Sequence, residues 1–290
     1  MEVSYIKLVE IAKKNSFAVG AFNFHNLEVL QGIIAAAEEL SSPVIVQTTP
    51  PFINDAGFKP VIFAAREIVS RCSVPAALHL DHGNSFELVQ KCLVNGFTSV
   101  MIDGSKMSFE KNIELTKKVV EISKAVREDI AVEAELGSIG GVEDQIIDGG
   151  SGKIIIPEEA VKFVEQTGID ALAPAIGTAH GIYKSEPIIR FDVAAELNKL
   201  IKIPMVVHGG SGLDVETFHK LIQLGFSKIN VGTELKIAWY KALENSFKNG
   251  KTDPLLASAE ARKAVKEIVI DKIKIFGSVG KARDFINIKD

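Results

Sequence analysis

Three histidines each follow a short apolar run and precede a glycine. They are His82, His180 and His208. Parallel strands that end in this way would present their imidazoles at one edge of a sheet. Three imidazoles with an open fourth position are the ligand set of a catalytic zinc ion. The alternative is three separate histidines satisfied in the core, but their shared position at strand ends favours a single metal site.

Short β-rich runs recur along the whole chain, and they must position these histidines. The runs are 18–22, 43–47, 76–80, 98–102, 130–135, 170–174, 204–208 and 227–231. Segments with helical spacing separate them, most clearly 26–40, 109–126, 157–167, 192–200 and 215–224. Eight strand–helix units predict an α/β fold, a closed (β/α)8 TIM barrel rather than an open doubly wound sheet. We expect one barrel domain over 1–290, with 234–290 as a C-terminal helical extension.

Length and composition narrow the class of protein. A chain of 290 residues suits one large barrel or two domains. The net charge of −4 argues against a nucleic-acid binder. We expect no membrane span, because no long apolar stretch occurs, and no signal peptide, because the first residues are too mixed. Cys72 and Cys92 form no Cys-x-x-Cys pattern, so we expect buried, reduced thiols in a cytoplasmic protein.

Carboxylates occupy the same expected rim as the histidines. Asp81 adjoins the first of them and would orient a ligand or move protons, with a structural acceptor in the turn as the alternative. Asp103 ends the next strand. Glu133 and Glu135 share one face of a further strand, which predicts metal coordination or acid–base work. His79 would face away from the rim on a regular strand, so we expect it inside the barrel or behind the ligands.

Glycine-rich segments follow several of the strands. The segment 137–144 carries two acids and predicts a mobile loop from which Glu143 reaches the site. Barrels often bind phosphate after their seventh and eighth strands, using backbone amides and a helix N-terminus. Tight turns without a ligand are the alternative. The expected substrate-binding residues are Asn23, Thr49, Gly181, Lys184, Gly209, Gly210, Ser211, Asn230, Val231, Gly232 and Thr233.

A metal, an anion site and several carboxylates together suit reversible aldol cleavage of a phosphorylated ketose. A metal polarises a carbonyl group and stabilises an enediolate. A carboxylate exchanges a proton with the hydroxyl beside the breaking bond. The alternatives are a zinc-dependent hydrolase and an inactive sugar-phosphate binding protein on the same barrel. The glycine-rich segments expected to bind phosphate disfavour the first, and the carboxylates beside the histidines disfavour the second.

At these residues the chain resembles the class II, zinc-dependent ketose-bisphosphate aldolases. The resemblance runs from Tyr5 to about Ala282. It rests on eight motifs that occur in order: 21–26, 79–83, 100–103, 132–137, 140–144, 175–181, 208–212 and 228–233.

The resemblance implies a role for each motif. The three histidines would bind the catalytic Zn²⁺, Asp81 would exchange a proton with the C4 oxygen, and Glu143 would handle the proton at C3 of the dihydroxyacetone phosphate half. Asp103 and Glu135 match positions that hold an alternative or second divalent metal. Residues 181, 209–211 and 230–233 would hold dihydroxyacetone phosphate, with Na⁺ or K⁺ nearby. We expect a homodimer or homotetramer.

The departures from the family pattern concern the aldehyde half of the substrate. Family members that act on bisphosphates commonly carry Asp-Pro-Arg, whose arginine reaches the distal phosphate of a neighbouring subunit's substrate. Here the third position is Leu255, which cannot donate to a phosphate. The segments 105–109 and 48–51 also depart from the pattern. These changes predict an aldehyde other than glyceraldehyde 3-phosphate, such as a sulfonated or unphosphorylated one, unless Lys106 or Arg283 replaces the arginine.

Overall fold

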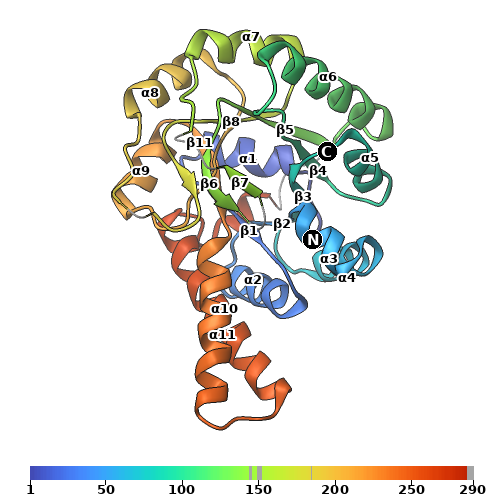
Figure 1. Ribbon diagram of the computed structural model, residues 1–290, viewed down its shortest axis with the longest axis vertical. Coiled ribbons are helices and arrows are strands. Elements are labelled where there is room, and N and C mark those ends of the chain that lie inside the picture. The colour runs from blue at the N-terminus through green and yellow to red at the C-terminus, as the bar shows by residue number, and fades with distance from the viewer. Residues whose placement is uncertain (144–145, 149–151, 184, 286–290) are drawn as a thin grey trace.

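Eight parallel strands close into a barrel at the centre of the molecule (Figure 1). The computed structural model describes residues 1–143, 146–148, 152–183 and 185–285. Around the barrel the strands follow the order β1-β11-β10-β8-β5-β4-β3-β2. Their bounds are β1 Val19–Asn23, β2 Val44–Thr48, β3 Ala76–Gly83, β4 Ser99–Ile102, β5 Ala131–Leu136, β8 Ala171–Pro174, β10 Met205–Val207 and β11 Phe226–Val231. The predicted TIM barrel is therefore confirmed, and every expected strand is present.

One helix precedes the first strand, and the following helices connect the strands and cover the outside of the barrel. They are α1 Tyr5–Lys14, α2 Leu27–Glu39, α3 Pro50–Ala56, α4 Phe58–Arg71, α5 Phe86–Val94, α6 Phe109–Val126, α7 Pro157–Thr167, α8 Phe191–Leu200 and α9 Val215–Gln223. Asn26, Ser85 and Asp214 each begin a helix by accepting a hydrogen bond from the backbone N–H three residues later. Pro157 opens α7, and Gly168 ends it in the left-handed conformation. The five helices predicted from spacing are α2, α6, α7, α8 and α9.

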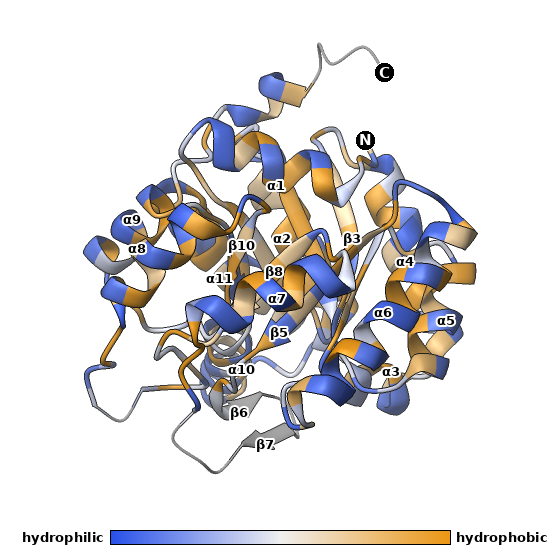
Figure 2. Cartoon of the chain, turned by 90° about the horizontal axis from the view of Figure 1, so that it is seen from above, coloured by the Kyte–Doolittle hydropathy of each residue, from blue (hydrophilic) through white to orange (hydrophobic). Residues whose placement is uncertain are grey.

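Helix α1 closes the amino-terminal end of the barrel, and the sequence offered no signal for it. Its residues Tyr5, Leu8 and Val9 are fully buried and pack against the small inward-facing residues of the strands. Just before this helix, Val3 donates a backbone hydrogen bond to Ala76, the first residue of β3. In Figure 2 the strands inside the ring are mostly apolar, whereas the surrounding helices show both polar and apolar residues. The apolar floor leaves the opposite, carboxyl-terminal end for polar residues.

Side-chain alternation along the strands builds levels inside the barrel. The inward residues are Ala77, His79 and Asp81 on β3, and Ala131, Glu133 and Glu135 on β5. Alternate residues of a strand face the same side, so an alanine level next to α1 is followed by a polar level and then by the rim. The predicted place of His79, inside the barrel, is confirmed because it is fully buried.

A small second sheet lies at the carboxyl-terminal rim. Its strands are β6 Gly140–Glu143, β7 Ile146–Asp148 and β9 Ala179–His180. Strand β6 pairs antiparallel with β7 and parallel with β9, where Gly141 is opposite His180. The segment 137–144 was expected as a loop, but its second half is this strand, because the backbone groups find partners on both sides. The side chain of Glu143 and residue 144 lie outside the described part of the chain.

The C-terminal helices predicted by the sequence are α10 Thr233–Lys248 and α11 Pro254–Ile275. They pack against each other as a hairpin whose tip projects beyond the barrel (Figure 1). The short helix η1 Lys281–Phe285 then returns to the amino-terminal end, where Ala282 donates to the Ser41 carbonyl. Among the described residues, no helix combines the length and apolar character that crossing a bilayer requires. The single-domain organisation stays a prediction.

Candidate active site

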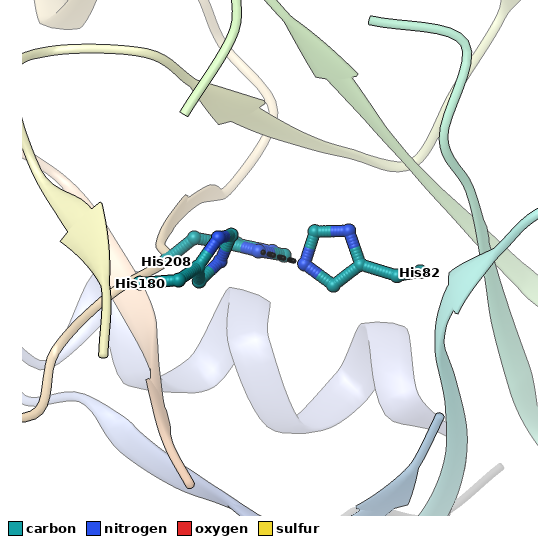
Figure 3. Close-up of side chains that lie close together, drawn as sticks. All are labelled: His82, His180 and His208. Carbon is teal, nitrogen blue, oxygen red and sulfur yellow. Dashed lines mark hydrogen bonds between the residues drawn. The ribbon is translucent and has the colours of Figure 1, made fainter. Parts of the chain in front are cut away.

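The three histidines meet at one point on the carboxyl-terminal rim. Figure 3 shows His180 and His208 beside each other, with His82 reaching toward them from the other side. One ring nitrogen of each lies within 4.8 Å of those of the other two. The rings stand edge to face, with centroids 4.8 to 5.7 Å apart. Three imidazole nitrogens this close together are a donor set that fits a tetrahedral metal ion with one open position.

The backbone of β3 turns His82 toward this point. A regular strand would alternate, and His82 would face away from Asp81. Instead the register of β3 against β4 shifts between Leu80 and Gly83, and His82 has a φ of +48°. Few residues other than glycine adopt such a conformation, and in folded proteins it concentrates at functional sites. The irregular strand end places Asp81 and His82 on the same side.

Carboxylates hold two of the three imidazoles. His82 Nδ1 lies 2.9 Å from Asp103 Oδ2, and His208 Nε2 lies 2.8 Å from Glu133 Oε1. Burial raises the pKa of Asp103, but the hydrogen bonds from His82 and Ser105 hold it well below its usual range. Carboxylates in this position set the tautomer of a ligating histidine and increase its basicity.

Three amides surround the carboxylate of Asp81. Asn23 Nδ2 and Gln47 Nε2 donate to Oδ2 at 2.8 and 3.1 Å, and Asn230 Nδ2 donates to Oδ1 at 3.1 Å. Gln47 also donates to Asn23 Oδ1 at 2.9 Å. Sequence reasoning named Asn23, Asp81 and Asn230 but missed Gln47, which follows the apolar run of β2 and precedes its last residue, Thr48. The amides fix one orientation of the carboxylate beside the histidines.

A second group of metal-ligand type adjoins the first. It consists of His82, Asp103 and Glu135, whose donor atoms lie within 4.8 Å of one another. Glu135 Oε1 accepts from the Ile139 amide at 3.1 Å, whereas Oε2 is buried without a hydrogen-bond partner. Burial, and secondarily the nearby Asp103, raise the pKa of Glu135 well above its ordinary value. A cation would relieve both effects, so these residues fit a second divalent metal.

Glu133 lies one level below the rim and belongs to neither group. It accepts from Lys228 Nζ at 2.9 Å and from the Tyr5 hydroxyl at 2.6 Å, besides its contact with His208. Burial would raise the pKa of Glu133, but Lys228 and His208 hold it well below its usual range. The sequence predicted metal coordination or acid–base work for this residue. In the structure both of its oxygens accept hydrogen bonds below the rim, and the predicted role stays a prediction.

His79 is expected to make the stability of the metal-free protein depend on pH. Its ring stacks on Tyr5, and burial together with Lys228 lowers its pKa well below the ordinary value. In the unfolded chain the His79 imidazole binds a proton near pH 6.5, whereas in the folded chain it stays neutral at that pH. Stability is therefore full above pH 6.5 and is lost as the pH falls below it, by up to about 1.4 kcal/mol per pH unit.

Replacing His79 with phenylalanine is expected to reduce this slope, because the ring is kept and the titrating group is removed. Urea unfolding of chelator-treated protein between pH 7.5 and 5.5 measures it. The exposed His219, changed to phenylalanine, is the matched control and is expected to keep the wild-type slope. Equal slopes for His79→Phe and wild type would contradict the assignment.

Two glycine-containing segments, 208–212 and 230–233, lie side by side at the rim, and we call them the phosphate loops. The Gly210 N–H donates to the Asn230 carbonyl at 3.1 Å. Gly209 has a φ of +67°, and a Cβ there would meet the Ala179 carbonyl. Gly232 is the N-cap of α10. Glycine-containing loops beside a helix N-terminus at this end of a barrel are of the kind that bind phosphate.

The remaining predicted substrate residues lie around these loops. Gly181 follows β9 with a φ of +92°, and Thr49 is buried at the start of α3, directly after β2. Lys184 lies outside the described residues. Sequence reasoning missed Tyr183, whose hydroxyl accepts from the Ala179 amide at 3.0 Å and donates to the Gly209 carbonyl at 2.8 Å. This hydroxyl ties the strand of His180 to the loop of His208. The predicted Ser211, Val231 and Thr233 are parts of the phosphate loops.

The two basic residues suggested as replacements for the missing arginine, Lys106 and Arg283, lie at opposite ends of the barrel. Asp253 caps α11 by accepting from the Leu255 amide at 2.8 Å, and the Leu255 side chain is 80% exposed. Lys106 is exposed in the loop after β4, on the rim side. Arg283 belongs to η1, which packs at the amino-terminal end of the barrel. Arg283 cannot replace the arginine within its own chain, because the barrel separates it from the site.

Comparison with known proteins identifies the family. The family model described as fructose-bisphosphate aldolase class-II matches residues 3–281. The chain is 43% identical over 286 residues to the fructose-bisphosphate aldolase of Geobacillus stearothermophilus, covering 97% of this chain and 98% of that one. The enzyme of the same name from Staphylococcus aureus (strain N315) is 42% identical over 288 residues, covering 97% and 99%. The solved structure of the YdjI aldolase from Escherichia coli K12 has a TM-score of 0.87 at 37% identity, covering 97% of this chain and 100% of that one. The chain therefore belongs to the class II fructose-bisphosphate aldolase family and is an enzyme of the aldehyde-lyase type.

Proposed function

We propose that this protein reversibly cleaves a ketose 1-phosphate or 1,6-bisphosphate into dihydroxyacetone phosphate and an aldehyde. One observation carries the proposal. The three histidines converge on one point next to a buried carboxylate, Asp81, that three amides hold in place. A metal site and an acid–base group side by side suit the breaking of a carbon–carbon bond between a carbonyl and a hydroxyl carbon.

Zinc is the metal we propose for the site formed by His82, His180 and His208. Imidazole nitrogens in a three-histidine set are common zinc ligands, and the carboxylates behind His82 and His208 are the usual supports of such ligands. When bound, the ion would polarise the substrate carbonyl and stabilise the negative charge of an enediolate. We propose a second divalent metal at His82, Asp103 and Glu135.

The chain's own residues would perform the remaining steps. The phosphate loops and Gly181 would hold the phosphate of the dihydroxyacetone half through backbone amides, with Na⁺ or K⁺ nearby. Asp81 would take the proton from the C4 hydroxyl as the bond between C3 and C4 breaks, and Glu143 would return a proton to C3. In the direction of synthesis the two proton transfers reverse.

We further propose that the aldehyde product is not glyceraldehyde 3-phosphate but a sulfonated or unphosphorylated aldehyde. The support is Leu255, at the position where relatives carry the arginine that binds the distal phosphate in the neighbouring subunit. An exposed leucine offers that phosphate no hydrogen bond and no charge. Asn23 ends β1 and Thr49 directly follows β2, so both lie at the carboxyl-terminal rim, where we propose that they contact the substrate.

We propose a homodimer or homotetramer and a cytoplasmic location. The projecting hairpin of α10 and α11 supports the first, because it exposes Tyr240, Phe247 and Leu256 besides Leu255. Large apolar side chains gathered on one projecting element are typical of a protein contact. The second is supported by Cys72 and Cys92, which are buried and free.

A substrate panel with purified, zinc-loaded enzyme tests the proposal. We expect release of dihydroxyacetone phosphate, measured with a coupled dehydrogenase, and a higher kcat/KM for fructose 1-phosphate or tagatose 1-phosphate than for the 1,6-bisphosphates. A phosphate-release assay run in parallel tests the hydrolase alternative. Removal of the metal with a chelator is expected to abolish turnover, and added Zn²⁺ to restore it.

A Leu255→Arg variant connects the substrate preference to this residue. The new guanidinium is expected to raise kcat/KM for a bisphosphate about 10- to 100-fold, the effect of one charge-assisted pair, and to leave the 1-phosphate unchanged. The neighbouring Leu256→Arg is the matched control. Efficient cleavage of a bisphosphate by the wild type would overturn the aldehyde proposal. Turnover that survives complete metal removal, or release of inorganic phosphate instead of dihydroxyacetone phosphate, would overturn the metal-aldolase proposal.

A further inference from the structure

We infer that Glu133 is a positioning residue for His208: its carboxylate sets which ring nitrogen of His208 faces the metal. The inference rests on the metal site of the proposed function. It concerns a residue one level below the rim, inside the barrel, and not a metal ligand or a group that touches substrate.

The contacts of His208 define its tautomer. Nε2 lies 2.8 Å from Glu133 Oε1, and Nδ1 lies 3.0 Å from His82 Nε2. An ionised carboxylate only accepts hydrogen bonds, so Nε2 must carry the proton and Nδ1 must keep its lone pair. Asn230 Nδ2 lies 3.3 Å from the same Nε2, but two N–H groups cannot pair, so Glu133 is the partner. The lone pair of His208 then points to the centre shared with the other two histidines.

Glu133 is held in place from below. Its second oxygen, Oε2, accepts from Lys228 Nζ at 2.9 Å and from the Tyr5 hydroxyl at 2.6 Å. Glu133, Lys228 and Tyr5 are fully buried, and each comes from a different element: β5, β11 and α1. Buried ion pairs seldom stabilise a fold more than apolar residues of the same volume would. Their presence in the floor of this barrel therefore suggests a purpose other than stability.

The carboxylates behind His82 and His208 contact opposite ring nitrogens. Asp103 contacts Nδ1 of His82 at 2.9 Å, which leaves Nε2 for the metal, whereas Glu133 contacts Nε2 of His208 and leaves Nδ1. Asp103 also belongs to the second group of metal-ligand residues, while Glu133 does not. Of the three rim histidines, Glu133 is hydrogen-bonded to His208, so its removal should affect the three-histidine site through that ring.

The substitution Glu133→Gln tests the inference, because it keeps the shape of the side chain and removes its charge. The glutamine oxygen is a weaker acceptor for His208, and its amide nitrogen would face the Lys228 ammonium, another donor. We expect Glu133→Gln to weaken Zn²⁺ binding about 10- to 100-fold, the usual effect of losing such a support. Competition with a chromophoric chelator measures the dissociation constant, and the visible spectrum of the Co²⁺ form reports the ligand geometry.

Tyr5→Phe is the matched control. It removes a hydrogen bond from the same carboxylate but leaves the contact between Oε1 and His208 intact. We expect its Zn²⁺ affinity to stay close to that of the wild type and its Co²⁺ spectrum to be unchanged. Circular dichroism and a thermal melt of each metal-free variant establish that it is folded. A folded Glu133→Gln protein with wild-type Zn²⁺ affinity and an unchanged Co²⁺ spectrum would overturn the inference.

A measurement on the wild type keeps the inference testable if the variant does not fold. Long-range ¹⁵N–¹H spectra of the zinc-loaded protein distinguish the two ring nitrogens, and the spectrum of His208→Ala assigns the resonance. We expect zinc on Nδ1 and a proton on Nε2 for His208, and the opposite arrangement for His82. Zinc on Nε2 of His208 would overturn the inference. A wild type that binds no Zn²⁺ would instead contradict the proposed metal site.

Discussion

Replacement of His180 by alanine is expected to lower kcat/KM for any cleaved ketose phosphate by about a thousandfold or more. His180 is one of the three nitrogen donors at the rim, and two donors would hold the metal poorly. A metal ion contributes several kcal/mol to stabilising the charge of an enediolate, and each 1.36 kcal/mol is a factor of ten in rate. Steady-state kinetics with metal analysis of the same sample measures both effects.

The same substitution at His219 is the control for this experiment. His219 is exposed on α9 and contacts the Ile275 carbonyl, away from the rim. His219→Ala is expected to keep its metal and its activity. If His180→Ala lost its metal but retained most of its turnover, the metal would have no part in the reaction. If it retained both, His180 would not be a ligand.

Replacement of Asp81 by alanine is expected to lower turnover by about 100- to 10,000-fold, the contribution of one general acid–base group. Metal content and affinity for dihydroxyacetone phosphate are expected to persist, because Asp81 belongs to neither group of metal-ligand residues and contacts the phosphate loops through the Asn230 side chain. Kinetics, metal analysis and calorimetric binding of dihydroxyacetone phosphate together test this separation.

Proton exchange sharpens the test of Asp81. In the proposed mechanism Glu143, and not Asp81, handles the proton at C3 of dihydroxyacetone phosphate. Asp81→Ala is therefore expected to exchange that proton with solvent deuterium while failing to cleave the ketose. Asp55→Ala, an exposed carboxylate on α3, is the control and is expected to behave as wild type. Wild-type turnover in Asp81→Ala would assign Asp81 another role.

The barrel and most of the site were predictable because their signals are local. A run of apolar residues ending in a polar one, followed by glycine, is visible in sequence, and in a parallel barrel all such ends lie at one rim. This pattern predicted that Asp81, the three histidines and the phosphate loops lie together at that rim. Gln47 was missed because Thr48 and Thr49 follow it, so no glycine marks it as a strand end.

Other features were not predictable, because they depend on contacts between residues far apart in the chain. Helix α1 carries no distinctive signal, yet it brings Tyr5 to within 2.6 Å of Glu133. The segment 140–143 resembles a loop in its glycine content, and its strand exists only through pairing with β7 and β9. The partners of Glu133 could not be named from the sequence, because Lys228 and Tyr5, which donate to its carboxylate, come from distant segments of the chain.

The sequence by itself determined the fold class, the rim and the family, since hydrophobic periodicity and glycine positions are properties of neighbouring residues. Only the tertiary structure decided how the polar groups pair. The left-handed turn at His82, the amides around Asp81 and the carboxylates behind His82 and His208 are set by distances across the barrel. A buried charge must find its partner in three dimensions, and the order of residues along the chain does not name that partner.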